Sequence, residues 1–411
     1  HVKCFKLEVV KYMTSNLKAL VFLLIFSLPS VVLGKTFTNC GGDFSVFLKE
    51  AERYATGIGI STEVVKETIR RAKFNPTIIK LDRKQRSFKL SFLDFSKRAI
   101  NDYRLVNGKK QFKKYQTVFN KALAIYGVPK EVITAFWAME TDFGAVQGNF
   151  NTLNSLASLA FDCRRPELFQ PEFIAAMQLI ERGDIDYDTT GAWAGEIGQV
   201  QMLPQDILEF GIDGNKDGKI SLKETPEDAI LTAANLINHM GWVKGEAWLE
   251  EVILPKDFYW ELAGFGRGRA LKDWENLGLK LRGEKLKIDE NLYSTLLLPQ
   301  GKKGPAFLAF KNFEVYLKWN DSFIYTVTAA HLAKRLGGAK KYKHNNPSDI
   351  LDIEAMIKLQ NVLRSKGYDV GKVDGILGAK TRQAVRSVQL EFGLSADSWP
   401  TKELLRKLLI N

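Results

Sequence analysis

The sequence is poor in the residue types that build metal and redox centres. Its 411 residues include only three cysteines and four histidines, and these are scattered along the chain. Without a cluster of such residues, a zinc centre or a cysteine–histidine catalytic pair has no support. A glycine-rich loop of the phosphate-binding kind is also missing, which argues against a nucleotide. The sequence therefore predicts no cofactor for catalysis.

Long apolar runs are equally scarce, and the one that occurs lies at the start of the chain. The first residue is His1, and Met13 is a plausible true start. From there a lysine, an apolar run broken by Pro29 and small residues near Gly34 are typical of a secretory signal peptide cut after Gly34. A membrane anchor is the alternative, but the run is short for a bilayer span. We expect residues 1–34 to be upstream sequence and signal peptide.

Dense runs of basic residues are absent, although basic residues outnumber acidic ones. The formal net charge is +12, and 45% of residues are hydrophobic and 26% charged, as in a globular protein with room for two or more domains. A basic balance suits polyanions such as nucleic acid, anionic lipid or an acidic cell-surface polymer, or serves solubility alone. Because no basic run is interleaved with aromatic residues, nucleic acid is not an expected partner.

The mature chain would keep two cysteines, Cys40 and Cys163. Export to an oxidising compartment makes a disulfide between them possible. Their distance along the sequence neither supports nor excludes the bond, so the pairing stays open.

Periodicity divides the chain into a long helical part, a strand-rich part and a small helical unit. Apolar residues at helical spacing dominate up to about residue 250. Between 251 and 326 four short runs suggest strands: "EVILP", "STLLLPQG", "PAFLAF" and "FEVYLKW". A polar linker at 339–348 precedes a compact unit at 349–410. The expected fold class is mainly α with a small β-containing subdomain, followed by a three-helix domain.

One acid interrupts an apolar helix pattern. In "FWAMETDFG", residues 136–144, Glu140 shares a helical face with Ile133 and Trp137. Burial and a place near the negative end of the helix dipole both favour the protonated form, which a general acid requires. The alternative is a glutamate at a helix end that bends out to solvent. Gly144 is expected to end this helix.

Several motifs, in order, resemble the lytic murein transglycosylases of the membrane-bound B type, in a soluble form. They are "FWAMETDFG", "LNSLASLAFDCRRPELF", "GAWAGEIGQVQMLPQDI", the aspartate-rich loop at 213 and "HMGWVKGEAW". The resemblance covers about residues 43–338 and implies a lysozyme-like α+β catalytic core. It also implies a periplasmic enzyme that cleaves the β-1,4 bond between MurNAc and GlcNAc in peptidoglycan. No water is added, so a 1,6-anhydroMurNAc end results.

The resemblance assigns a single catalytic acid, Glu140. It protonates the leaving oxygen and then acts as base on the C6 hydroxyl of MurNAc, where ordinary glycosidases use two carboxylates. By the same resemblance, four residues line the sugar cleft: Gln201, Asn320, Tyr325 and Trp319. Core packing is the alternative for Trp319. The expected partner is the glycan strand, and a monomer is expected.

Two positions depart from the family pattern. Ala192 stands where a serine is frequent, and Glu196 where the best-known members have a small residue. As a second carboxylate in the cleft, Glu196 would permit a hydrolytic route with an activated water. The other interpretation is a surface or supporting acid. A hydrolytic muramidase is thus the nearest alternative function, and a non-catalytic wall-binding scaffold is the next.

A second motif stands independently of the resemblance. "DGNKDGKISLKE", residues 213–224, matches the calcium loop of an EF-hand at every fixed position. The expected donors are Asp213, Asn215, Asp217, the carbonyl of Lys219, Ser221 and Glu224. The resemblance offers Asp228 as another residue that could close the loop in place of Glu224. A structural Ca²⁺ is expected, and a hydrated polar turn is the alternative.

The C-terminal unit resembles small three-helix peptidoglycan-binding domains. Its expected core is Ile357, Leu363, Ala384, Val385, Val388, Leu404 and Leu408. Asp374 and Gly375 make a tight turn before the second helix, while Gln360 and Thr381 have no assigned ligand role. A binding unit beside a cutting unit raises the effective concentration of an insoluble substrate. The plan is therefore a catalytic domain at 43–338, the linker and this binding domain.

Overall fold

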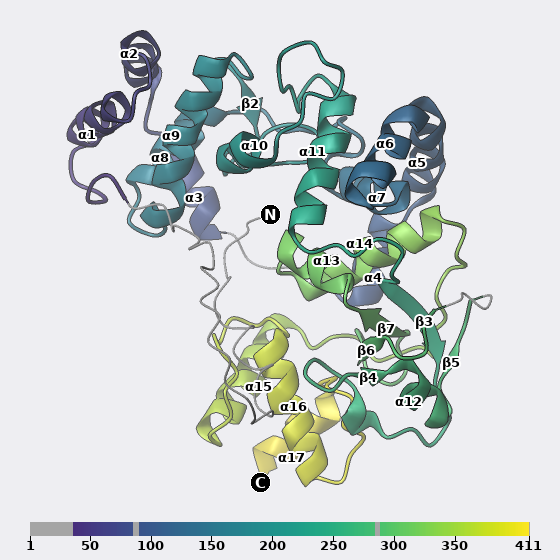
Figure 1. Cartoon of the computed structure of the whole chain (residues 1–411). Coiled ribbons are helices and arrows are strands. Elements are labelled where there is room, and N and C mark those ends of the chain that lie inside the picture. The colour runs from purple at the N-terminus through teal and green to yellow at the C-terminus, as the bar shows by residue number, and fades with distance from the viewer. Residues whose placement is uncertain (1–35, 85–89, 284–287, 411) are drawn as a thin grey trace, which may run out of the picture. The chain divides into compact units, whose positions relative to one another are not determined.

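The computed structural model describes residues 36–84, 90–283 and 288–410 (Figure 1). The predicted signal peptide lies outside the described residues. The chain forms two compact units, each treated by itself. Their described parts are residues 36–84 and 110–239 for the helical unit, and residues 90–109, 240–283 and 288–410 for the sheet unit. No described helix is long and apolar enough to cross a membrane.

Helices make up most of the helical unit. They are α1 (Phe44–Gly57), α2 (Thr62–Arg71), α3 (Pro76–Lys84), α6 (Gln116–Tyr126), α7 (Lys130–Thr141), α8 (Thr152–Phe161), α9 (Pro166–Arg182), α10 (Pro204–Phe210) and α11 (Pro226–His239). The strands β1 (Phe150–Asn151) and β2 (Thr190–Gly191) form a short antiparallel ribbon. Helix starts follow local chemistry: the side chains of Asp43 and Asn151 accept bonds from first-turn amides of α1 and α8. The helix α5 (Asp102–Lys114) runs from one unit into the other.

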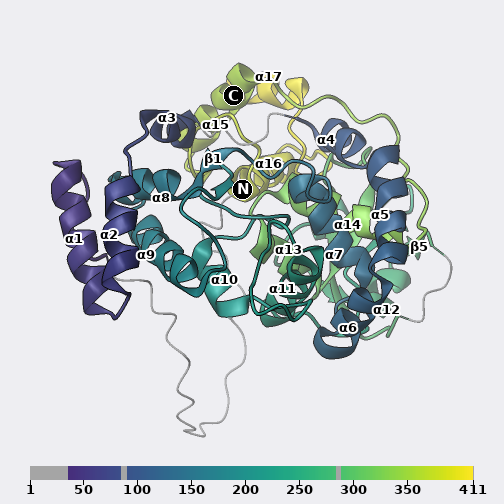
Figure 2. The same ribbon diagram turned by 90° about the horizontal axis from the view of Figure 1, so that it is seen from above.

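Helices α8 and α9 form the frame of the helical unit. They lie side by side in both views (Figures 1 and 2), and nearly every residue of α8 is buried. One apolar cluster joins them to α1, α2 and α3 and includes Phe47, Leu156 and Phe173. Each large apolar side chain buried in this way contributes about 1.5–3 kcal/mol. This cluster therefore stabilises the frame on which the candidate site is built.

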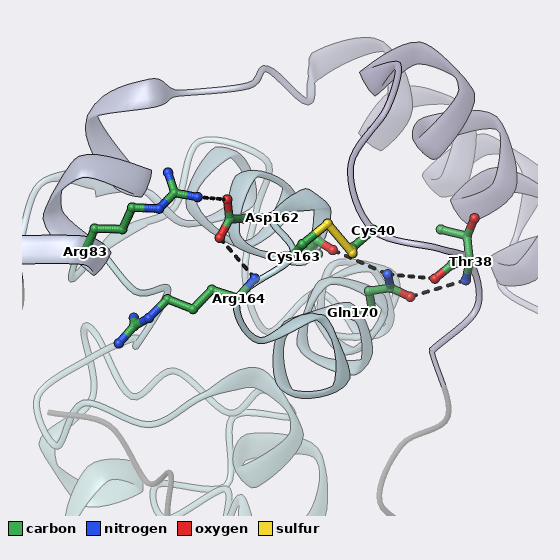
Figure 3. The surroundings of a disulfide bond; sticks show 8 residues. Thr38, Cys40, Arg83, Asp162, Cys163, Arg164 and Gln170 are labelled. Carbon is green, nitrogen blue, oxygen red and sulfur yellow. Dashed lines mark hydrogen bonds and ion pairs between the residues drawn. A yellow bond between two sulfur atoms is a disulfide. The ribbon is translucent and has the colours of Figure 1, made fainter. Parts of the chain in front are cut away.

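A disulfide between Cys40 and Cys163 ties the segment before α1 to the segment between α8 and α9 (Figure 3). The pairing that the sequence left open is thus made in the structure. Beside it, the side-chain amide of Gln170 donates to the carbonyl of Thr38 (3.1 Å) and accepts from its N–H (3.3 Å). The bond links residues 123 positions apart, so it restricts the unfolded chain strongly.

The sheet unit is built on an antiparallel sheet with the strand order β4–β6–β7–β3–β5. Its strands are β3 (Leu249–Ile253), β4 (Arg269–Ala270), β5 (Lys280–Leu281), β6 (Tyr293–Leu297) and β7 (Ala306–Phe310). Around them stand α4 (Phe92–Ala99), the 3-10 helix η2 (Trp260–Leu262), α12 (Leu271–Asn276), α13 (Phe313–Trp319) and α14 (Phe323–Leu336). All five residues of the central strand β7 are buried. This strand is therefore covered on both faces.

Three of the four predicted strand runs overlap β3, β6 and β7, but the fourth is wrong. "FEVYLKW" forms the helix α13. Its Phe313, Tyr316 and Trp319 are buried at a spacing of three, which suits one side of a helix. A seven-residue apolar run is too short for periodicity to separate helix from strand.

Three helices form the small C-terminal domain: α15 (Ile353–Ser365), α16 (Ala379–Glu391) and α17 (Lys402–Ile410). They enclose an apolar cluster of their own, which holds every predicted core residue except Ile357. Ile357 is half-buried, and Met356 and Leu359 fill the core beside it. The expected order of a mainly helical part, a small sheet and three final helices agrees with the observed architecture.

The C-terminal domain packs on the rest of the sheet unit through Arg382 of α16. Its guanidinium donates to the carbonyl of Pro299 (2.8 Å) and stands over the ring of Phe323, 5.0 Å from the centroid. Burial lowers the pKa of Arg382 to about 10. On a neighbouring loop, the amide of Lys302 donates to Asp397 (2.9 Å). These contacts hold the domain against the sheet within one compact unit.

Candidate active site

Glu140 lies in the last turn of α7, a helix that is buried on nearly every side. Residues 132–138 are all buried, whereas Glu140 itself is half-buried. One turn earlier, Trp137 packs edge-on against Phe143 with ring centroids 5.6 Å apart. A helix without a wet face is fixed by its surroundings. Glu140 is therefore held on a rigid helix. A catalytic group needs such support, because it must approach its ligand in one geometry.

The helix ends three residues before the expected stop at Gly144. It ends at Thr141, and Asp142, Phe143 and Gly144 have positive φ angles of 50°, 62° and 86°. The first two of these are not glycine, so the turn costs about 1–2 kcal/mol per residue unless other contacts hold it. The Thr141 hydroxyl supplies such contacts, because it accepts from the Gly144 amide (2.9 Å) and donates to the Gln199 carbonyl (2.5 Å).

The segment 191–202, which begins at the last residue of β2, folds back on itself. The Ala192 amide donates to the Glu196 carbonyl (2.9 Å). A Cβ atom on Gly191 would lie 2.1 Å from that same oxygen, so the close approach requires glycine. Ile197 and Met202 then pair as an isolated antiparallel bridge. The segment is thus a compact loop. The site residues of this segment lie on the loop and not on a helix or strand.

Gln201 sits on this loop in the left-handed region, with φ of 52°. Its side-chain amide donates to the carbonyls of Gly198 (2.8 Å) and Gln147 (3.2 Å). Since Gln199 accepts from Thr141, the loop is also bonded to the end of α7. The structure therefore brings the segments of two predicted site residues, Glu140 and Gln201, into one network within the helical unit.

Glu196 is buried, with 8% of its surface exposed. Burial raises the pKa of its carboxyl group, and the charge of Glu140 raises that pKa further. Arg165 acts in the opposite direction, but its guanidinium is engaged by Asp82 in an ion pair. The interpretation of Glu196 as a surface acid is therefore wrong. The folding of the loop hides this acid and brings it within electrostatic reach of Glu140.

The aspartate-rich loop between α10 and α11 folds around its first carboxylate. Asp213 accepts bonds from the amides of Lys216 (2.6 Å) and Gly218 (2.8 Å), and Asn215 donates to Asp217 (2.8 Å). Among the described residues, no three His, Cys, Asp or Glu side chains gather around one metal position. A cation would therefore also need amide and carbonyl oxygens, and such a mixed oxygen set suits calcium better than a transition metal.

Asp228 and not Glu224 faces this loop. Asp228 is fully buried, and its two oxygens accept from the amides of Gly214 (2.8 Å) and Ser221 (2.7 Å). Burial raises the pKa of Asp228, while these amides lower it. Glu224 is exposed. Of the two candidates to close the loop, the sequence pattern favoured Glu224, and the geometry favours Asp228.

Lys223 connects the aspartate-rich loop to the candidate site. Its ammonium donates to the carbonyl (3.0 Å) and hydroxyl (2.8 Å) of Thr190, next to the segment 191–202. Its carbonyl accepts from the side-chain amides of Gln147 (3.1 Å) and Gln199 (3.3 Å). A displacement of the aspartate-rich loop would therefore also displace the backbone that positions Gln201.

The other three predicted substrate residues belong to the sheet unit. Trp319 ends α13, Asn320 caps it, and Tyr325 lies in the first turn of α14. All three are buried. The Asn320 side chain accepts from the amide of Ser322 (2.9 Å), so it fixes the turn between the two helices. These three residues form one local group, on a different unit from Glu140 and Gln201.

Sequence reasoning missed three residues that hold the helical part of the site together: Thr141, Gln147 and Gln199. Thr141 and Gln199 lie within the motifs "FWAMETDFG" and "GAWAGEIGQVQMLPQDI", and Gln147 lies three residues after the first of these. A signal was available for Thr141, because a threonine in the last turn of a helix can hydrogen-bond to neighbouring backbone groups through its hydroxyl. The roles of Gln147 and Gln199 depend on contacts with Lys223, which no local pattern reveals.

In the C-terminal domain, Gln360 is fully buried and holds the predicted turn. Its carbonyl oxygen accepts from the amides of Asp374 (3.1 Å) and Gly375 (2.9 Å). Its NH₂ group donates to the Ile376 carbonyl (3.0 Å) and the Thr381 hydroxyl (3.2 Å). Both residues without an assigned ligand role thus belong to one internal network that shapes the turn.

Comparison with known proteins identifies two families in the chain. The family described as "Transglycosylase SLT domain" matches residues 43–334. The chain belongs to this transglycosylase family. The family described as "Putative peptidoglycan binding domain" matches residues 353–408. The resemblance drawn from the sequence motifs is thereby confirmed for both parts.

Individual relatives agree with the family. The chain is 34% identical over 159 residues to membrane-bound lytic murein transglycosylase B of Escherichia coli (strain K12), a match over 38% of this chain and 44% of that protein. The match therefore spans less than half of this curated relative. A crystal structure of SltB3 from Pseudomonas aeruginosa in complex with NAG-anhNAM-pentapeptide has 32% identity and a TM-score of 0.83, covering 90% of this chain and 100% of that chain.

A more distant neighbour is the Escherichia coli lytic transglycosylase Slt35 in complex with calcium. It has 25% identity and a TM-score of 0.60, and covers 75% of this chain and 98% of that chain. With SltB3, it confirms the predicted fold class, a mainly helical transglycosylase with a small sheet, here followed by a helical peptidoglycan-binding domain. The predicted enzyme class, a peptidoglycan lytic transglycosylase, is the class of these relatives.

Proposed function

We propose that this chain cleaves the β-1,4 bond between MurNAc and GlcNAc in peptidoglycan and leaves a 1,6-anhydroMurNAc end. The observation that carries the proposal is a single half-buried acid, Glu140, on the end of a buried helix, in a member of the transglycosylase family. The relative SltB3 binds NAG-anhNAM-pentapeptide. An anhydro sugar of that kind is what intramolecular cleavage produces.

Glu140 performs both proton transfers in this proposal. Its carboxyl first protonates the glycosidic oxygen as the C1–O bond breaks, and its carboxylate then accepts the proton of the MurNAc C6 hydroxyl as that oxygen bonds to C1. The proton lost in the first step returns in the second, so no water is consumed. One carboxyl group suffices because the nucleophile belongs to the substrate, unlike the water of an inverting glycosidase.

The substrate-binding role is proposed for Gln201, Asn320, Tyr325 and Trp319. Gln201 is supported by its place on the loop bonded to the end of α7. Asn320, Tyr325 and Trp319 are supported by their motif and by the fixed turn between α13 and α14. Core packing explains the burial of Trp319 equally well. A Trp319→Phe variant separates the two roles, since loss of sugar contact raises KM without lowering the melting temperature.

A hydrolytic muramidase is the second candidate function, and one observation favours it. Glu196 is a second acid within electrostatic reach of Glu140, and hydrolytic glycosidases use two carboxyl groups. Mass analysis of the muropeptides released from purified sacculi separates the candidates. Anhydro ends from the wild type, with none from Glu140→Gln, support the transglycosylase. Reducing ends support the muramidase, and no release at all supports a non-catalytic scaffold.

A structural Ca²⁺ is proposed for the aspartate-rich loop. The proposed donors are Asp213, Asn215, Asp217, Asp228 and the carbonyl of Lys219, which a bound ion would have to draw together, since no three acids of the described residues already share one metal position. Ser221 and Glu224 remain from the sequence prediction, but the exposure of Glu224 argues against that residue. The calcium complex of Slt35 supports the proposal. Because Lys223 bonds this loop to Thr190, the ion would stiffen the site rather than react. Titration calorimetry tests it, and no heat at millimolar calcium would contradict it.

We also propose the domain plan and the location. The catalytic domain spans 43–338, the linker 339–348 and the binding domain 349–410, and the exported protein works as a monomer in the periplasm on glycan strands. The family matches at 43–334 and 353–408 and the disulfide support this plan. N-terminal sequencing of periplasmic protein tests the cleavage after Gly34, and sedimentation tests the monomer.

A further inference from the structure

One loop of the sheet unit presents an aromatic ring to solvent. Phe265 is 48% exposed and lies between Gly264 and Gly266, which have positive φ angles of 107° and 77°. The loop is fixed to the sheet, because the Gly264 amide donates to the carbonyl of Leu296 in β6 (2.8 Å). A single exposed ring is ordinary on a protein surface, so the meaning of this one depends on its neighbours.

The ring of Phe265 packs against that of Phe323, the first residue of α14. The two ring centroids are 5.8 Å apart, and the ring planes stand at 80°. Phe323 is half-buried. It comes three residues after Asn320 and two before Tyr325, which are two of the residues proposed to bind the sugar. The aromatic pair therefore lies next to the turn that carries proposed substrate residues.

The pair is also in contact with the C-terminal domain. The guanidinium of Arg382 stands over the ring of Phe323, 5.0 Å from the centroid. On the same helix, α16, Arg386 donates to the carbonyl of Glu261 (2.8 Å), four residues before Phe265. Helix α16 thus supports both the ring of Phe323 and the loop that carries Phe265. The two rings are held in place from both sides.

We propose that Phe265 and Phe323 form a stacking platform for a sugar ring of the glycan strand, beyond the residues already proposed to bind it. This inference rests on the proposed function. The apolar C–H face of a sugar ring packs well on an aromatic ring, and rings that are already fixed lose little conformational entropy on binding. A strand that leaves the turn between α13 and α14 would cross this platform beside the peptidoglycan-binding domain.

The surroundings of the platform favour this occupant. Arg267 follows Phe265 by two residues, and Arg382 stands over Phe323, so each ring has a basic residue beside it. Peptidoglycan carries carboxyl groups on the peptides attached to its sugars, and opposite charge assists its approach. A second copy of this chain would need a contact of roughly 800 Å² per partner, which two rings, one of them half-buried, do not offer.

The test measures binding by the full-length Glu140→Gln parent, in which the proposed cleavage is blocked. The probes are soluble, uncross-linked peptidoglycan strands and the single disaccharide-peptide unit. Adding Phe265→Ala should weaken the binding of strands about tenfold, the scale of losing one aromatic contact. The binding of the single unit should change by less than about twofold, because the residues of the cleft suffice to hold it.

Three further variants in the same parent show whether stacking is the cause. Phe265→Tyr keeps the flat ring and should bind strands like the parent. Phe265→Leu keeps apolar surface without a flat face and should bind as weakly as Phe265→Ala. Tyr259→Ala removes another exposed aromatic side chain, six residues earlier, and should leave the affinity unchanged. Because both side chains are exposed, the melting temperatures should agree.

Other results overturn the inference. Equal affinity of Phe265→Ala and the parent means that the ring does not touch the strand. Parent-like binding by Phe265→Leu means that the contact is not stacking, and equal weakening by Tyr259→Ala means that it is not specific to the pair. A wild-type dimer that Phe265→Ala splits in sedimentation makes the rings a contact between copies. The proposed function fails separately, when wild type releases no anhydro ends from sacculi although these binding differences are found.

Discussion

The helical unit and the C-terminal domain both bury polar side chains, but the surroundings of these side chains differ. Gln360 is fully buried, and its amide has hydrogen-bond partners on both its oxygen and its nitrogen. Glu196 is almost as hidden, and the like charge of Glu140 acts on it. A satisfied buried group stabilises a fold, whereas a buried acid beside a like charge costs stability. The contrast marks Gln360 as structural and Glu196 as a candidate for chemistry.

The largest expected effect is the loss of activity when the acid of the helical unit is replaced. Glu140→Gln keeps the size of the side chain but cannot donate a proton to the leaving oxygen. We expect muropeptide release to fall by roughly 10³-fold, a typical contribution of general acid–base catalysis, with an unchanged melting temperature. Glu209→Gln, which removes an exposed acid of α10, is the matched control. Residual activity above about a tenth of wild type would show that another group supplies the proton.

The next effect is a loss of stability that we expect in the helical unit and not in the C-terminal domain. Replacing Cys40 and Cys163 together with serine removes a cross-link between residues 123 positions apart. We expect the helical unit to lose about 3 kcal/mol of unfolding free energy. Hydrogen–deuterium exchange of the full-length protein should show faster exchange in α1 and α8 and no change in α15–α17. Equal loss of protection in both regions would mean that they do not unfold separately.

A smaller effect is expected when the structural role of Gln360 in the C-terminal domain is removed. Gln360→Ala removes the acceptor of the amides of Asp374 and Gly375, at a cost of about 1 kcal/mol. We expect exchange to accelerate in α15–α17 and sacculus binding to weaken, while cleavage of small soluble glycans is unchanged. The exposed Gln383 provides the control Gln383→Ala. If both variants behave like wild type, the Gln360 network does not hold the turn.

The smallest effect concerns the aspartate-rich loop. If Asp228 closes it, Asp228→Asn should weaken calcium binding about tenfold or more, the scale of losing a supporting ligand interaction. Glu224→Gln should change the affinity by less than about threefold. Titration calorimetry on both variants, with melting temperatures measured alongside, checks this order. A stronger loss in Glu224→Gln would restore the pattern expected of an ordinary EF-hand.

Much of the site and fold could be predicted from local sequence. The apolar periodicity of α7 places Glu140 at the end of a buried helix, and the alternation of aspartate, asparagine and glycine marks the loop at 213. The expected C-terminal core is confirmed except for Ile357. Patterns of this kind succeed because each depends on residues within one or two turns of one another.

What could not be predicted depends on contacts between distant residues. The burial of Glu196 arises from a loop that is bonded to Thr141 through Gln199, and nothing in "GAWAGEIGQ" reveals that fold. The bond between Cys40 and Cys163 depends on a separation of 123 residues. The helix α13 was mistaken for a strand because its seven residues fit both periods. That Asp228 is buried and Glu224 exposed at the aspartate-rich loop required knowing which side chain faces inward.

The most direct test of the central claim is the isotope content of the new chain ends. Sacculi are digested by the wild type in water enriched in oxygen-18, and the released muropeptides are analysed by mass spectrometry. Attack by the C6 hydroxyl of MurNAc takes no oxygen from solvent, so the account predicts anhydro ends without the label. Reducing MurNAc ends that each carry one oxygen-18 atom would contradict it, because a water molecule would then have been the nucleophile.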